Sequence, residues 1–210
     1  MKTTSYNKMK KKLFYLVVAV MTTFCVACQK QQASCVIIGD IPTTYNGIRI
    51  FLVPMYGPKT AQYVDSVVIE NGHFQFAKDT VMLAKILLDY HYRMGVQELL
   101  VVTEPGQVKV TIDSVSHATG TPLNDSLDCW KLATEERNAR LVEYYRTGSN
   151  VQIDSLQKAH KQLTRRMAEN TKGTVLGDFL GAFYPYTIQR QNPDGTVVTV
   201  NTDTNEVVEE

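Results

Sequence analysis

The sequence predicts an α+β protein, in which an antiparallel β-sandwich or barrel of about seven strands is followed by a helical hairpin and a short third helix. Short apolar, β-branched segments separated by turn residues fill residues 34–116, a pattern typical of a sandwich. Apolar residues then recur at helical spacing across residues 117–183. The chain has 210 residues, 44% of them hydrophobic, which is enough to bury a core.

Residues 1–27 have the pattern of a bacterial lipoprotein signal peptide. Basic residues at Lys8–Lys12 precede the apolar run Leu13–Ala27, which is shorter than the roughly 20 residues that span a hydrocarbon core. The run ends at Cys28, and the residues before it resemble a lipobox. We expect cleavage before Cys28, attachment of fatty acids such as palmitate to that cysteine, and a tether at residues 28–33. A plain secretory signal and an uncleaved short anchor are the alternatives.

This signal places the chain outside the cytoplasm, anchored to the outer or the inner membrane. Gln29–Gln32 has no acidic cluster of the kind associated with surface export, so the periplasmic face is favoured over the cell surface. After residue 27 the chain has 17 basic and 21 acidic residues, a net charge of −4. Nucleic acid requires a basic face, so we expect no nucleic-acid partner.

Two turn motifs organise the β part. Asn71-Gly72 accepts the positive φ angles of a type I′ turn and predicts a hairpin between the third and fourth expected strands. Pro105-Gly106 predicts a second hairpin between the last two. The seven expected strands are Cys35–Ile38, Ile48–Val53, Tyr63–Ile69, Phe74–Phe76, Leu83–Tyr90, Glu98–Thr103 and Val108–Ile112.

The helical part begins at Thr121-Pro122, which reads as an N-cap and a first helical residue. This helix is expected to run to Gly148, and Ser149–Gln152 then opens a second helix with the pattern of a capping box. Val175–Phe183 is expected to be the third helix.

The C-terminal region, residues 184–210, is expected to contain a small hairpin and a tail. Asn192–Gly195 supplies the turn between Tyr186–Arg190 and Thr196–Val200. Asn201–Glu210 is polar and acidic, so we expect it to be disordered.

Several of these phrases resemble one family in their order and spacing. They are Val64-Asp65-Ser66 with Glu70-Asn71-Gly72-His73-Phe74-Gln75-Phe76, and Glu104-Pro105-Gly106 with Gly120-Thr121-Pro122-Leu123-Asn124-Asp125. Over about residues 34–130 the chain resembles domain of unknown function 4369, the N-terminal β domain of lipid-anchored proteins of Bacteroides-type bacteria. In such proteins it often precedes a thioredoxin-like, AhpC/TSA-type domain. After residue 27 this chain has no Cys-x-x-Cys pair, so the resemblance implies an accessory or sensing module without the thioredoxin domain.

Two cysteines remain after Cys28, at Cys35 and Cys129. Outside the cytoplasm a disulfide between them would persist, and it would close a loop of roughly 94 residues. A buried free thiol in the core is the alternative.

No residue spacing in the chain predicts a catalytic, metal or cofactor site. The histidines lack the tight spacing of zinc ligands, and the serines lack a Gly-x-Ser-x-Gly elbow. Glycines spaced by four indicate a helix face that packs closely against a neighbour. The aromatic clusters are interpreted as core residues in preference to residues that bind sugars or protein partners. The residues weighed are His73, His91, His117 and His160; the pair Asp89 and His91; Ser66, Ser114, Ser116 and Ser126; the cluster Asp113, Ser114 and His117; Gly173, Gly177 and Gly181; and Tyr90, Tyr92, Tyr144, Tyr145, Phe183, Tyr184 and Tyr186.

Three functions therefore stay open. The favoured one is a lipid-anchored binding or scaffolding module with a protein or glycan partner, and without catalysis or cofactor. The alternative is a non-catalytic accessory to periplasmic thiol-disulfide chemistry of the thioredoxin-like kind. A hydrolase with a site assembled from distant residues is the third.

Overall fold

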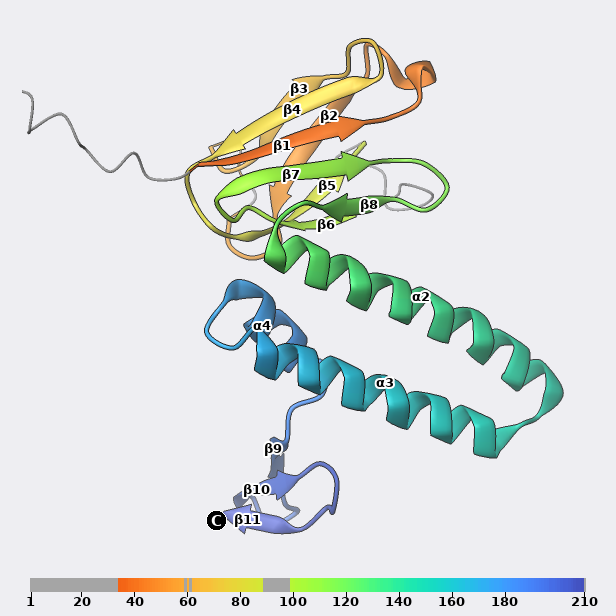
Figure 1. The fold of residues 1–210 in the computed structure, drawn as a ribbon. Helices are drawn as coiled ribbons and strands as arrows, with labels where there is room; N and C mark the ends of the chain where they lie inside the picture. Colours follow the sequence, from red (N-terminus) through yellow and green to blue (C-terminus); the bar gives the residue numbers. More distant parts are fainter. Residues whose placement is uncertain (1–33, 59, 61, 89–98, 210) are drawn as a thin grey trace, which may run out of the picture. The chain divides into compact units, whose positions relative to one another are not determined.

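The computed structural model describes residues 34–209 apart from residues 59, 61 and 89–98, and Figure 1 shows the order of their elements. The expected signal peptide, the tether and Cys28 lie outside the described residues, as do the pair Asp89 and His91 and the rings of Tyr90 and Tyr92. Residues 34–210 form one unit by their contacts. Among the described residues, none of the helices combines the length and the apolar character that a membrane crossing requires.

Eight strands form two four-stranded sheets, with strand orders β4-β1-β7-β8 and β3-β2-β5-β6. The α+β prediction is confirmed, with two departures. β1 and β7 pair in parallel, and β8 was not among the expected strands, so the β part ends at Thr119 and not at residue 116. The strands are β1 (Cys35–Asp40), β2 (Arg49–Pro54), β3 (Asp65–Val68), β4 (His73–Lys78), β5 (Leu83–Leu87), β6 (Leu99–Val102), β7 (Gly106–Thr111) and β8 (His117–Thr119), with a 3-10 turn η1 at Thr43–Tyr45.

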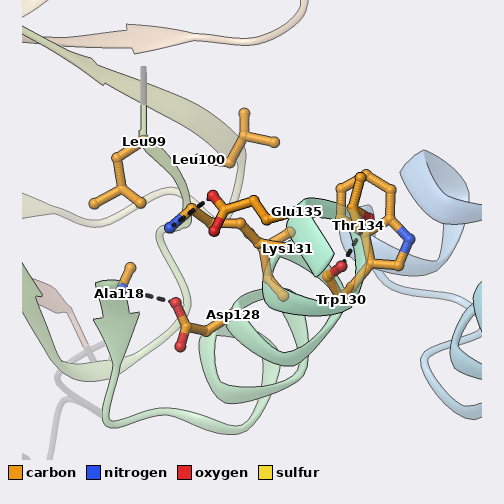
Figure 2. A pocket seen from close by; sticks show the side chains of 9 residues that line it. Leu99, Leu100, Ala118, Asp128, Trp130, Lys131, Thr134 and Glu135 are labelled. Atoms are coloured by element: carbon orange, nitrogen blue, oxygen red, sulfur yellow. Dashed lines mark hydrogen bonds and ion pairs between the residues drawn. The ribbon is translucent and has the colours of Figure 1, made fainter. Parts of the chain in front are cut away.

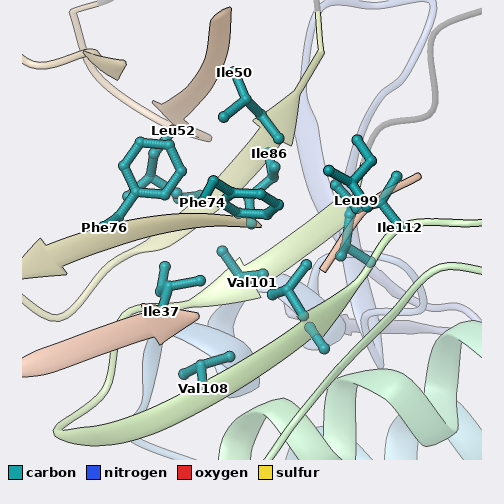
Figure 3. Packing of buried hydrophobic residues seen from close by; sticks show 14 of the residues in the cluster. Ile37, Ile50, Leu52, Phe74, Phe76, Ile86, Leu99, Val101, Val108 and Ile112 are labelled. Carbon is teal, nitrogen blue, oxygen red and sulfur yellow. The ribbon is translucent and has the colours of Figure 1, made fainter. Parts of the chain in front are cut away.

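The main core lies between these sheets and takes alternate side chains from each strand. In β4, Phe74 and Phe76 are buried while the alternate residues His73, Gln75 and Ala77 are exposed, as the period of two in a half-buried strand requires. Figure 3 shows their rings packed with Ile37 of β1 and with Leu52 of β2. Gly39 lies directly against Phe74, because a Cβ there would come within 1.9 Å of the ring.

The expected hairpin at Asn71-Gly72 is only partly correct. Both residues have positive φ angles, 54° and 77°, and Glu70 and His73 exchange two backbone hydrogen bonds of 3.0 and 2.9 Å across the turn. Beyond that bridge the strands separate, because β3 pairs with β2 in one sheet and β4 pairs with β1 in the other. The turn therefore connects two sheets.

The expected hairpin at Pro105-Gly106 is wrong for the same reason. β6 pairs with β5, whereas β7 pairs with β1 and β8. Alternation of apolar residues shows which face of a strand is buried but does not identify its neighbour, and both strands bury that face in the same core. Gly106, with a φ of 129°, turns the chain from one sheet to the other.

Three helices follow, α2 (Pro122–Thr147), α3 (Asn150–Asn170) and α4 (Val175–Gly181). As predicted, Thr121 is the N-cap of α2, and Gly148 ends it with a left-handed φ of 70°. The Ser149 side chain makes no capping hydrogen bond within the described residues, so the capping box is not formed. A second core cluster joins the helices to the sheet through Leu83, Val102, Leu127, Trp130, Leu176, Phe179 and Leu180.

The glycine face expected on the third helix is reduced to one residue. A Cβ at Gly177 would lie 2.3 Å from the Thr171 carbonyl oxygen, so only glycine fits there. Gly173 precedes the helix with a φ of 78°, and at Gly181 a Cβ would meet no described atom within 4 Å.

The C-terminal region forms a three-stranded sheet of order β11-β10-β9. Its strands are β9 (Thr187–Gln191), β10 (Val197–Asn201) and β11 (Val207–Glu209), so the predicted hairpin is confirmed. The expectation that residues from 201 onward are disordered is wrong for the described part. Asn201 accepts backbone hydrogen bonds from Asp203 and Thr204, and Val207 pairs with Val200.

Candidate functional site

Glu104 caps the first turn of α2 from outside the helix. One of its carboxylate oxygens accepts hydrogen bonds from the backbone N–H groups of Leu123 and Asn124, at 2.6 and 3.2 Å. These N–H groups have no acceptor inside the helix, and a negative charge is favoured at this end. Asp125 completes the junction by accepting from the Gly120 N–H at 2.8 Å.

Asn124 ties the same turn to the edge of a sheet. Its side chain is fully buried, accepts from the Val102 N–H at 2.9 Å and donates to the Val102 carbonyl at 2.8 Å. It also donates to the Thr121 hydroxyl at 2.8 Å. We refer to Glu104, Thr121, Asn124 and Asp125 as the α2 latch. Glu104 and Asn124, which belong to the family motif, therefore use their side chains to join α2 to the sheet.

A groove of about 850 Å³ lies further along the helical hairpin, lined by α2, α3 and the C-terminal region. Ligand sites in proteins usually have volumes of about 300–1,000 Å³. Two acidic and four basic side chains line the groove, so its net charge is positive. The lining residues are Arg137, Leu141, Asp154, Gln157, Lys158, Lys161, Gln162, Arg165, Tyr184, Thr202 and Asp203.

One side of the groove is closed by ion pairs. Asp203 accepts from Lys161 and from Arg165, each at 2.5 Å, and Lys161 followed by Arg165 lowers the pKa of this carboxyl. Arg165 also donates to the Tyr184 and Pro185 carbonyls, at 2.9 and 3.0 Å. These contacts hold the C-terminal region against α3.

Arg137 and Tyr184 of the groove contact the buried His160, which is not itself one of the lining residues. Arg137 Nη1 donates to His160 Nδ1 at 3.3 Å, and Nε2 lies 2.9 Å from the Thr134 hydroxyl. Since Nδ1 accepts, the network assigns the proton to Nε2, and Thr134 in turn donates to the Trp130 carbonyl. Burial, followed by the charge of Arg137, lowers the pKa of His160, so its ring is neutral at neutral pH.

Comparison with known proteins identifies the N-terminal part of this unit. Residues 35–127 match the family model described as domain of unknown function (DUF4369). The chain contains a DUF4369 domain. Neither the curated proteins nor the solved structures that were compared gave a match.

A smaller pocket lies where the end of the DUF4369 domain meets α2 (Figure 2). Its volume is about 230 Å³, and Leu99, Leu100 and Trp130 contribute apolar walls. Lys131 donates to the Ser116 carbonyl and lies 3.4 Å from Glu135. These charges are paired, and the volume is below that of most ligand sites.

Asp113, Ser114 and His117, which were weighed as a cluster and not favoured, are not brought together around one proton. His117 Nδ1 lies 3.0 Å from Asp128 of α2, and Asp113 accepts from the Val115 N–H at 2.8 Å. The Ser116 hydroxyl is buried without a hydrogen-bond partner in the described part of the chain.

Cys35 and Cys129, which were considered for a disulfide, are both free in the structure. Cys35 is buried in the sandwich core, whereas Cys129 is exposed on α2. The disulfide is therefore not formed here, and Cys35 is the core thiol of the alternative interpretation. Burial, followed by the charge of Glu104, raises the pKa of Cys35 to about 11, which makes it a poor nucleophile.

The other weighed residues have local roles. His73 pairs with Asp40 at 2.6 Å on the surface, and no group of three or more His, Cys, Asp or Glu side chains in the described ranges is arranged to hold a metal. Ser66 accepts from Arg49, and Ser126 donates to the Pro122 carbonyl.

The aromatic clusters divide between core and surface. Phe183 packs on Trp130 with 5.1 Å between ring centroids, and Tyr184 joins the His160 network. Tyr186 is half exposed under the Arg165 guanidinium, 4.1 Å from its ring centroid, and Tyr145 is exposed on α2.

Sequence reasoning missed the groove. Lys158, Lys161 and Arg165 are spaced by three and four, a signal of one basic helix face that could have been found. Arg137 and Tyr184 join this face only through the packing of α2 and the C-terminal region.

Proposed function

We propose that the protein is a lipid-anchored, extracytoplasmic binding module that holds its ligand in the groove between α2, α3 and the C-terminal region. The groove itself is the observation that carries the proposal, because it has the volume of a ligand site and is lined from three separate segments. Anchoring through Cys28 is supported by the signal pattern of residues 1–27.

Two further observations support binding without catalysis. His160, the buried base beside the groove, has both ring nitrogens hydrogen-bonded inside the protein, so neither is directed at a substrate. The motif residues Glu104 and Asn124 make structural contacts. A protein or glycan component of the cell envelope that places a small group in the groove is the partner we favour.

A matched pair of tryptophan substitutions on α3 tests this proposal. Gln162 is exposed and lines the groove, whereas Gln152 is exposed on the same helix outside it. The full chain, purified from membranes in mild detergent, is incubated with soluble envelope extract. The masses of the protein and of its complexes are then measured by native mass spectrometry. We expect a stoichiometric adduct on the wild type and on Gln152→Trp that is lost from Gln162→Trp. An adduct retained by Gln162→Trp, or no adduct on the wild type, contradicts the proposal.

A further inference from the structure

Arg137 carries a positive charge that the described part of the protein does not neutralise. It makes no ion pair there, and its acceptors are His160 Nδ1 at 3.3 Å, the Tyr184 hydroxyl at 3.2 Å and Asn138 Oδ1 at 2.9 Å. All three acceptors are neutral. A half-buried guanidinium with neutral partners has lost part of its hydration without gaining a counter-charge, which is unfavourable.

Lys158, which is exposed, places a second positive charge on the same groove. Across the described ranges it too makes no ion pair, although Asp154 lies one helical turn before it. The two remaining cations differ, because Lys161 and Arg165 share the carboxylate of Asp203. The groove thus has one neutralised pair of cations and one pair without a counter-ion.

We propose that Arg137 and Lys158 form an anion subsite that holds a carboxylate or phosphate group of the ligand. This inference rests on the proposed function and specifies the chemistry of its ligand. Nη1 of Arg137 donates to His160 and Tyr184, and Nε and Nη2 both donate to Asn138. One Nη2 hydrogen therefore remains to donate a charge-assisted hydrogen bond to an oxyanion, and the Lys158 ammonium adds a second positive charge. The Tyr184 hydroxyl, 3.2 Å from Arg137, lies within reach of the same group. Asp203 shows this chemistry in the same groove, since its carboxylate lies between an arginine and a lysine.

The test uses the fluorescence of Trp130, which is the one tryptophan of the full chain. Its ring lies 6.3 Å from that of His160, which bonds to Arg137, so an anion at Arg137 alters its surroundings. The full chain is titrated with inorganic phosphate, with citrate and, at equal ionic strength, with sodium chloride. We expect a saturable change with phosphate, citrate or both, and none with chloride. Tighter binding of inorganic phosphate than of citrate indicates a phosphate group on the ligand, and tighter binding of citrate indicates a carboxylate.

Three variants locate the subsite. Arg137→Gln and Lys158→Gln are each expected to weaken anion binding at least tenfold. Arg140→Gln removes the same charge from an exposed position that pairs with Glu136 and does not line this groove, and it should bind as the wild type does. Arg137 also supports His160, so its variant is checked for folding by circular dichroism. Lys158 makes no such contact, so its variant tests the subsite even where Arg137→Gln unfolds.

The results separate this inference from the proposed function. Absence of saturable anion binding by the wild type, or equal weakening in Arg140→Gln and Lys158→Gln, shows that there is no anion subsite here. If the adduct that Gln162→Trp abolishes is still present, the groove binds a neutral ligand and the proposed function stands. If that adduct is also absent, both fail.

Discussion

Replacing Asn124 by alanine tests whether the α2 latch holds the helix to the sheet. The side chain is fully buried and satisfies both backbone groups of Val102, which is itself fully buried on the edge strand β6. Alanine leaves the Val102 N–H and carbonyl without partners in a place that water does not reach. The Thr121 hydroxyl loses its donor as well.

The cost follows from these groups. A buried polar group left without a hydrogen bond costs about 1–3 kcal/mol, so leaving two backbone groups without partners costs about 4 kcal/mol. For a protein of this size, each kcal/mol shifts the melting temperature by about 2–4 °C, so we expect a decrease of about 8–16 °C. Ser126→Ala is the matched control in the same helical turn. It removes one hydroxyl that donates to the Pro122 carbonyl and replaces serine with a better helix former.

Urea unfolding of the 34–210 unit, followed by Trp130 fluorescence and by circular dichroism, measures both variants. We expect the Asn124→Ala midpoint to fall with little change in the slope m, and the Ser126→Ala midpoint to stay within about 0.5 kcal/mol of the wild type. If Asn124→Ala loses no more stability than Ser126→Ala, the latch does not hold α2 and the reasoning is refuted.

Three further predictions follow from other residues. Cys28→Ala should abolish incorporation of labelled palmitate into the protein, measured by metabolic labelling and immunoprecipitation, and labelling of the variant at the wild-type level would contradict acylation of Cys28. Cys129 should react with maleimide in the folded protein at neutral pH, whereas buried Cys35 should react only after unfolding; rapid labelling of both would contradict its burial and raised pKa. Because burial and Arg137 lower the pKa of His160 below its ordinary 6.5, the folded state binds fewer protons than the unfolded state. The contribution of His160 to stability is therefore complete above pH 6.5 and is lost as the pH falls through the lowered pKa. Between pH 7.5 and pH 5 the urea midpoint should fall less in His160→Gln than in the wild type. An equal fall of the midpoint in both proteins would refute this.

The sequence could predict those elements whose signals are local. Thr121-Pro122 and Gly148 bound α2 as expected, and Asn71-Gly72 adopts the positive φ angles that its turn requires. The partners of the strands could not be predicted, because the alternation that identifies a buried face is the same for every strand packed on one core. That is why two turns that join different sheets were interpreted as hairpins.

The candidate site was less predictable than the fold. The basic spacing of Lys158, Lys161 and Arg165 is visible in the sequence, but a charged helix face is usually solvated. Only the fold shows that Asp203, from a tail expected to be disordered, neutralises two of these charges. The polar composition of Asn201–Glu210 concealed Val207, whose β-branched side chain favours the strand β11.

The last prediction connects the DUF4369 domain with the groove. The family match ends at residue 127, and each groove residue lies after it, from Arg137 to Asp203. α2 runs from Pro122 to Thr147 without interruption, so the latch at Asn124 fixes the direction of a helix that carries Arg137 about 20 Å further along. In the fraction of Asn124→Ala that remains folded, we therefore expect weaker phosphate binding by Trp130 fluorescence, while Ser126→Ala binds normally. Unchanged binding in both would mean that α3 and the C-terminal region position Arg137 by themselves, and that the family motif does not influence the groove.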